Sequence, residues 1–138
     1  MEFYASRARG LILKLTQTFY FEAAHTLKGR YVDVHAKMQS ENIHGHTYHA
    51  SISVRGEPDK EGMVKDFGHF DWVINPLKLR LDHKFLDNVE GLGRPTLENL
   101  CLYIADFCKD VKGLCEVTVE RKASGDKCTY EIRKAQKK

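Results

Sequence analysis

The sequence predicts one α+β domain, in which an antiparallel sheet of four strands carries two helices on one face. Alternation of apolar and polar residues in both halves of the chain is typical of strands, and the segments between have apolar residues at helical spacing. The chain contains no repeat and no linker, so residues 1–138 are expected to form a single domain. The order strand, strand, helix, helix, strand, strand (ββααββ) fits a sheet that is covered on one side.

The first two strands are expected on either side of a long loop. Residues 11–24 are rich in β-branched and aromatic residues with partial alternation, whereas residues 26–43 have no clean period and contain Gly29. Residues 46–56 give the clearest strand pattern, and residues 57–62 have the composition of a turn.

The first helix is expected after a short extended segment at residues 63–67 and should begin at Asp66 or Gly68. Pro76 lies inside the helical pattern, so this helix should kink or restart there. The apolar stripe of the helix consists of Phe70, Val73, Ile74, Leu77 and Leu81.

The second helix has clearer ends. Thr96 is a good N-cap, and residues 112–113, Lys-Gly, should end the helix. Its apolar stripe consists of Leu97, Leu100, Ile104 and Phe107. Residues 115–120 and 128–133 then alternate as two strands around a turn at residues 124–126.

Composition excludes several classes of function. Hydrophobic residues make up 42% and charged residues 30%, and the net charge of +3 is well short of a nucleic-acid-binding signature. No run reaches the ~18 apolar residues of a membrane span, and residues 1–9 lack the features of a signal peptide. The absence of a C-x-x-C pair favours reduced thiols over a disulfide framework for Cys101, Cys108, Cys115 and Cys128. We therefore expect a cytoplasmic protein that binds neither nucleic acid nor membrane.

Three histidines at strand ends are the strongest candidates for a functional site. His44 and His46 lie two residues apart at the start of a strand, so they project from the same face, and His25 ends the preceding strand. Two imidazoles so placed can converge on one Zn²⁺, and Gly45 leaves the opposite face free of bulk. Three protein ligands leave a position open for water or substrate, which distinguishes catalytic from structural zinc.

A closed, structural zinc site would need a fourth ligand. His35 lies in the loop and remains open for that role, whereas His49 has the wrong strand parity relative to His44 and His46. A fourth ligand is not evident, so we favour the open site.

A family resemblance emerges when the short motifs are taken in order. The motifs are Phe21-Glu22-Ala23-Ala24-His25, His44-Gly45-His46, Met63-Val64-Lys65-Asp66-Phe67, Leu81-Asp82-His83-Lys84, Pro95-Thr96-Leu97-Glu98-Asn99 and Val117-Thr118-Val119-Glu120. In this order the chain resembles the 6-pyruvoyltetrahydropterin synthases and the related 6-carboxytetrahydropterin synthases of the queuosine pathway. The resemblance covers residues 11–133, nearly the whole chain.

The resemblance implies a tunnelling fold, in which trimers close their sheets into one barrel and two trimers stack as a homohexamer. It implies Zn²⁺ on the three histidines named above and 7,8-dihydroneopterin triphosphate as the substrate. It also implies that Asp82 and His83 act together in proton transfer, which agrees with the effect of a carboxylate on imidazole basicity. By the same resemblance, Glu120 would grip the pterin ring, with Thr96 and Glu98 near the pocket.

One departure from the family pattern changes the expected product. The family usually has a cysteine base four or six residues before the first histidine of H-G-H, and here those positions hold Ser40 and Met38. Glu41 lies three residues before His44, which resembles the E-x-x-H-G-H variant of the family. Members of that subgroup cleave the substrate side chain to give 6-hydroxymethyl-7,8-dihydropterin, a folate precursor. Glu41 is therefore the expected catalytic base.

We accordingly expect a zinc-dependent lyase that releases 6-hydroxymethyl-7,8-dihydropterin. The alternative within the class is a 6-pyruvoyl- or 6-carboxytetrahydropterin synthase in which Glu41 performs the task of the cysteine. The alternative from another class is a non-catalytic protein that binds zinc and a pterin.

Overall fold

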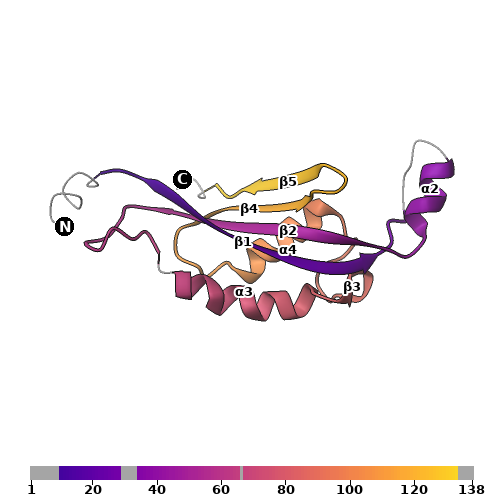
Figure 1. Cartoon of the computed structure of the whole chain (residues 1–138), viewed down its shortest axis with the longest axis horizontal. Helices are drawn as coiled ribbons and strands as arrows, with labels where there is room; N and C mark the ends of the chain where they lie inside the picture. The colour runs from indigo at the N-terminus through magenta and orange to yellow at the C-terminus, as the bar shows by residue number, and fades with distance from the viewer. Residues whose placement is uncertain (1–9, 29–33, 66, 134–138) are drawn as a thin grey trace, which may run out of the picture.

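The computed structural model describes residues 10–28, 34–65 and 67–133, and its centre is a five-stranded sheet with two helices along one face (Figure 1). The strands lie in the order β3-β1-β2-β4-β5. All neighbours are antiparallel except β1 and β3, which are parallel. The elements are β1 (Leu13–His25), α2 (Val34–Glu41), β2 (His44–Gly56), α3 (Phe67–Leu81), β3 (Lys84–Phe85), the 3-10 helix η1 (Leu86–Asn88), α4 (Leu97–Phe107), β4 (Leu114–Arg121) and β5 (Asp126–Glu131).

The α+β architecture is confirmed, and the expected four-strand sheet is corrected to five strands. The additional strand, β3, pairs through only two residues with the end of β1. A two-residue strand carries no periodicity, so no sequence pattern could indicate it.

The expected loop at residues 26–43 is also corrected in part, because residues 34–41 form α2. This helix stands beyond the ends of β1 and β2 (Figure 1) and has no buried residue. Without an apolar face there is no helical period for sequence reasoning to detect.

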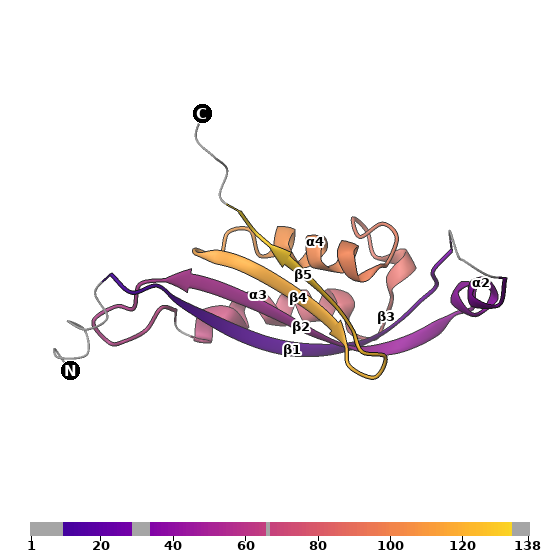
Figure 2. The ribbon, with the colours of Figure 1, turned by 90° about the horizontal axis from the view of Figure 1, so that it is seen from above.

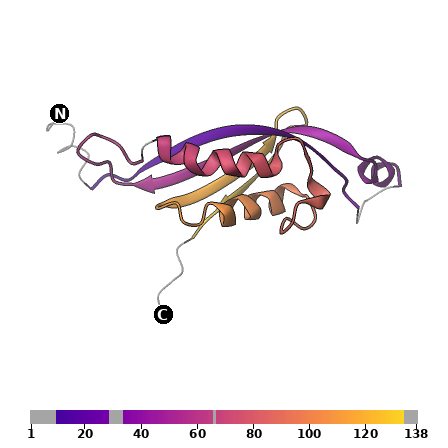
Figure 3. The same cartoon turned by 90° about the horizontal axis from the view of Figure 1, so that it is seen from below.

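The other two helices lie side by side on one face of the sheet (Figure 3). The expected end of the second helix at residues 112–113 is corrected: α4 ends at Phe107, and turn hydrogen bonds from the N–H groups of Lys109 and Val111 follow it. Thr96 caps α4 by accepting a hydrogen bond from the Asn99 N–H at 3.1 Å. The helix α3 begins at Phe67 and does not restart at Pro76, which lies inside it. The carbonyl that loses its partner at this proline belongs to Trp72, on the exposed side of the helix, where water can replace the missing donor.

The core lies between the sheet and these two helices. Alternate residues of β1, β2 and β4 are buried, among them Phe21, Tyr48 and Val119. They meet the apolar stripes of α3 and α4, of which Phe70, Ile74, Leu77, Leu81, Leu100 and Ile104 are almost fully buried. Each such side chain contributes about 1.5–3 kcal/mol by leaving water.

No helix of the described residues covers the opposite face of the sheet (Figure 2). Hydroxyl pairs cross it between neighbouring strands, including Thr16 with Ser53 at 2.7 Å and Thr18 with Ser51 at 2.9 Å. None of the helices that the structure describes is long and apolar enough to cross a membrane.

Candidate metal centre

The three histidines predicted from the sequence come together at one end of the sheet. His25 ends β1 and is the register partner of His44, which begins β2, and His46 follows two residues later. All three share the parity of the buried residues Phe21 and Tyr48, so they project toward the helix side. The Nε2 atom of His25 lies 3.0 Å from Nε2 of His44 and 3.0 Å from Nε2 of His46. In the described residues, this is the one group of three metal-ligating side chains in such proximity.

Backbone carbonyls fix the tautomers of two of these imidazoles. The Nδ1–H group of His25 donates to the carbonyl of Pro95 at 3.0 Å, and that of His44 donates to the carbonyl of Asn42 at 2.7 Å. A carbonyl can only accept, so in each neutral ring the lone pair lies on Nε2. Metal-binding histidines commonly donate their other ring N–H to a carbonyl in this way, which fixes the orientation of the ring.

Burial disfavours the protonated form of two of these imidazoles. Burial lowers the pKa of His25. Burial and then the neighbouring Arg121 cation lower the pKa of His46 to about 4. The Nε2 lone pairs of neutral His25 and His46, 3.0 Å apart, repel each other unless a cation lies between them. A tetrahedral Zn²⁺ with bonds of about 2.0–2.1 Å would separate such nitrogens by roughly 3.3 Å. The donor set therefore fits a divalent metal ion.

A carboxylate that the sequence analysis missed holds the backbone after His25 in place. Asp87, in η1, accepts a hydrogen bond from the Thr26 N–H at 2.9 Å and another from the Thr26 hydroxyl. These bonds tie the end of β1 to the segment before α4. No sequence pattern links positions 61 residues apart, so nothing could have indicated this contact.

Arg121 is the second residue that sequence reasoning missed. It ends β4, two residues after the fully buried Val119, so its side chain lies on the histidine face of the sheet. Its Nη1 atom lies 3.3 Å from Nε2 of His46, and its Nη2 atom lies 2.5 Å from Asp126 Oδ2. Hydrogen bonds from Ser124 and Arg121 lower the pKa of Asp126. The alternation of Val117, Val119 and Arg121 could have revealed this placement.

Glu120 is not brought to the histidines. It is the register partner of His49, and both lie on the polar face, opposite the metal centre of the same chain. The expected parity of His49 is confirmed, and this residue is no part of the histidine cluster. His35 lies on α2, hydrogen-bonded to Gln39 at 3.1 Å, and it is not part of the cluster either.

Glu41 ends α2 and is half-buried. The segment around it is anchored at both sides: the carbonyl of Ser40 accepts from the Leu27 N–H at 2.7 Å, and the carbonyl of Asn42 accepts from His44. The backbone on each side of Glu41 is thus fixed to the end of β1 and to the metal centre.

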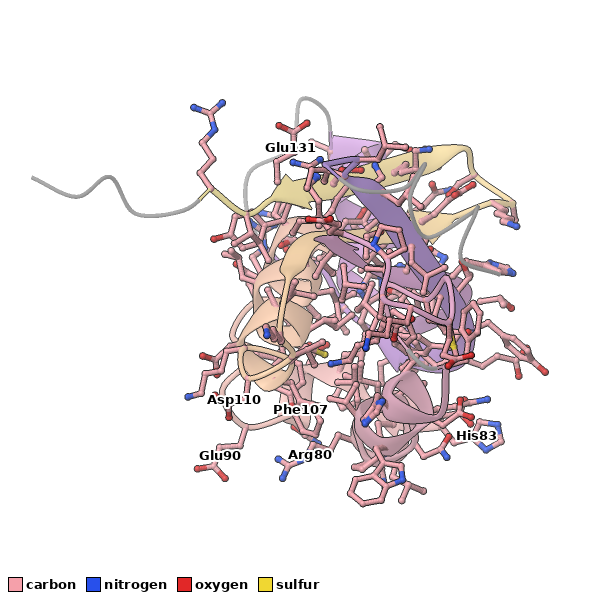
Figure 4. All side chains as sticks on the ribbon, turned by 90° about the vertical axis from the view of Figure 1, so that its left-hand side faces the viewer. Arg80, His83, Glu90, Phe107, Asp110 and Glu131 are labelled. Atoms are coloured by element: carbon pink, nitrogen blue, oxygen red, sulfur yellow. The ribbon has the colours of Figure 1, made fainter. Side chains whose placement is uncertain are left out.

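Asp82 and His83 lie at the end of α3, beside β1. Asp82 Oδ1 accepts a hydrogen bond from the Glu22 N–H at 2.9 Å and lies 3.9 Å from Nε2 of His83, too far for a hydrogen bond. The His83 side chain is 78% exposed, and Figure 4 shows it at the periphery of the molecule. His83 contributes to an open hollow of about 560 Å³, which is also lined by Glu22, Thr47 and His46. Asp82 and His83 are therefore neighbours without a hydrogen bond between their side chains, and their shared role in proton transfer stays a prediction.

Thr96 and Glu98 lie at the start of α4. The Thr96 hydroxyl is committed to the helix cap, and Glu98 is exposed in the first turn. Both follow Pro95, whose carbonyl holds His25. This end of α4 therefore borders the metal centre.

The cysteines are all free, and none of them belongs to the histidine cluster. Burial raises the pKa of Cys101 to about 12, that of Cys108 to about 12, and that of Cys115. These thiols stay protonated near neutrality, so they are poor bases.

The chain is similar to known proteins whose names all refer to pterins. A family model described as 6-pyruvoyl tetrahydropterin synthase matches residues 14–133. The dihydroneopterin monophosphate aldolase of Pyrococcus furiosus is 34% identical over 86 residues, which cover 62% of this chain and 66% of that protein. The 6-carboxy-5,6,7,8-tetrahydropterin synthase of Synechocystis is 34% identical over 92 residues, covering 62% of this chain and 67% of that protein.

Among solved structures, the 6-pyruvoyl tetrahydropterin synthase of Caenorhabditis elegans superposes with a TM-score of 0.74 and 26% identity. The match covers 88% of this chain and 96% of that chain. The matched segments span only 36–66% of the length of four curated relatives, among them the Pyrococcus furiosus aldolase.

Proposed function

Because the chain belongs to the 6-pyruvoyl tetrahydropterin synthase family, we propose that it is a metal-dependent lyase acting on 7,8-dihydroneopterin triphosphate. The proposed product is 6-hydroxymethyl-7,8-dihydropterin. The observation that carries the proposal is Glu41, three residues before His44, in a chain whose Cys101, Cys108 and Cys115 have raised pKa values. A relative named as an aldolase of dihydroneopterin monophosphate supports this choice of product.

The proposed metal ion is zinc, held by His25, His44 and His46. When bound there, it would act as a Lewis acid toward the hydroxyl groups of the substrate side chain. The carbonyls of Pro95 and Asn42 keep the Nε2 atoms of His25 and His44 available for it.

In the proposed reaction, Glu41 accepts the proton of the outer side-chain hydroxyl. The bond between the two hydroxyl-bearing carbons then breaks, and its electron pair passes into the imine of the pterin ring. The outer carbon becomes the aldehyde group of a two-carbon fragment that leaves with the triphosphate. The inner carbon takes up a proton, which we assign to the Asp82–His83 pair after a side-chain rotation brings the two groups together. The two products contain all the atoms of the substrate, so the step needs no oxidant or reductant.

We further propose that Thr96 and Glu98 border the substrate pocket. Glu120 faces away from the metal centre of its own chain. We therefore propose that it contributes to a site that another copy of the chain completes. A homohexamer made of two trimers provides such shared sites. The polar, helix-free face of the sheet is suited to line the inside of a barrel.

A second candidate function is that of a 6-carboxy- or 6-pyruvoyltetrahydropterin synthase. It is favoured by the names of the Synechocystis relative and of the Caenorhabditis elegans structure. In that reaction Glu41 would still act as the base, but the product would differ.

Product analysis distinguishes the two functions. After incubation of the zinc-loaded protein with 7,8-dihydroneopterin triphosphate, mass spectrometry should detect 6-hydroxymethyl-7,8-dihydropterin. Glu41→Gln keeps the size of the side chain but removes its basicity, so turnover should fall by about 100- to 10,000-fold while zinc stays bound. Ser40→Ala is the matched control and should be nearly silent. A 6-carboxy or 6-pyruvoyl product, or full turnover by Glu41→Gln, would reject the proposed assignment.

A further inference from the structure

An ion pair with Asp126 holds the guanidinium of Arg121 beside the metal centre. Arg121 and Asp126 are register partners across the β4–β5 hairpin, and their side chains form an ion pair at 2.5 Å. The Ser124 hydroxyl donates to the same carboxylate oxygen at 2.9 Å. The Arg121 side chain is only 20% exposed, so the cation is fixed beside His46 rather than free in solvent.

Of the Arg121 nitrogens that do not contact Asp126, Nε has no acceptor among the described residues and Nη1 has only Nε2 of His46. The Nε atom is buried. The Nη1 atom lies 3.3 Å from Nε2 of His46. A metal ion bound to the three histidines would take the lone pair of that nitrogen. With the ion bound, both Nε and Nη1 require another acceptor.

The charges lead to the same requirement. The three imidazoles are neutral ligands, and the carboxylate that pairs with Arg121 lies on Nη2, on the other side of the guanidinium from His46. A divalent ion beside a fixed guanidinium in a partly buried site is unfavourable without a negative charge between them. We propose that Arg121 and the open position of the ion together bind an oxyanion, with one oxygen facing each.

The ligand class is a carboxylate or a phosphate, because both present two oxygens with the spacing that a guanidinium fork recognises. This inference rests on the proposed metal site and assigns it a subsite for an anionic group of the substrate or product. It makes Arg121 a specificity-determining residue.

Anion binding to the protein loaded with Co²⁺ tests the subsite without any turnover. The visible absorption of the bound Co²⁺ would be followed during separate titrations with inorganic phosphate and with acetate. Arg121→Gln should weaken binding of the preferred anion by about 10- to 100-fold, the value of a charged hydrogen bond. Arg121→Lys keeps the charge and should lose less. The matched control is Lys122→Gln, which removes the same charge from the exposed next residue and should leave the titration unchanged.

The response to each anion identifies the source of the group: a response to acetate alone assigns a carboxylate, and a response to phosphate alone assigns a phosphate. The inference is overturned if the parent responds to neither anion. It is also overturned if Arg121→Gln binds the anion as well as the parent, or if Lys122→Gln weakens binding equally. Failure of the lyase assay with intact anion binding would reject the proposed reaction and leave the subsite standing.

Discussion

At the scale of single residues, strand parity decides which side chains share the site. His25, His44 and His46 were predictable because a period of two places them on one face. The family resemblance indicated Glu120, whose role stays a prediction. The buried Val117 and Val119 place odd-numbered residues of this strand on the histidine face, and that parity also indicates Arg121 as a neighbour of the cluster. The contacts of Asp87 with Thr26 could not be predicted, because they depend on packing between distant segments.

The buried thiols make a pH prediction at this scale. The pKa of Cys101 and that of Cys108 are each raised to about 12, above the unfolded value of about 8.5. The folded state thus holds more protons than the unfolded state between these values, so the free energy of unfolding should fall as the pH rises through this window. Urea unfolding should show this decline, and the double variant Cys101→Ala/Cys108→Ala should show a smaller one. An identical decline in both proteins would mean that these thiols do not contribute.

At the scale of elements, long periodic segments were predicted well and short ones were not. The strands β1, β2 and β4 and the helices α3 and α4 each bury an alternating or helical stripe, and β5 alternates half-buried and exposed residues. These patterns are visible in the sequence. The helix α2 buries nothing and β3 has two residues, so neither leaves a pattern. Their positions matter nevertheless, because α2 ends at Glu41 and β3 pairs beside His25.

A pair of glycines tests the packing between elements. Gly113 and Gly125 both have a positive φ, of 83° and 79°, so alanine at either position should lose about 1 kcal/mol of stability. A Cβ atom at Gly113 would also lie 2.7 Å from the backbone oxygen of Arg55, whereas at Gly125 it meets nothing within 4 Å. Gly113→Ala should therefore cost about 1–3 kcal/mol more than Gly125→Ala in urea unfolding. Equal losses would show that β4 can move away from β2 without penalty.

At the scale of the whole molecule, one sheet separates two environments. The helix side holds the core and the three histidines, and the other side carries hydroxyl pairs and no helix of the described residues. The layer arrangement followed from the order of elements in the sequence, because amphipathic helices must cover an apolar sheet face. How copies of the chain assemble does not follow from the periodicities of one chain, because the contacts between copies depend on surfaces that carry no such pattern.

Metal content tests the central claim, that His25, His44 and His46 together hold one metal ion, most directly. Elemental analysis of the purified parent protein should find about one zinc per chain. His46→Ala removes a ligand whose Nε2 atom lies 3.0 Å from that of His25, and the zinc should be lost. His49→Ala removes an imidazole from the opposite face of the same strand and should retain the metal in full. Full zinc content in His46→Ala, or none in the parent, would contradict the account.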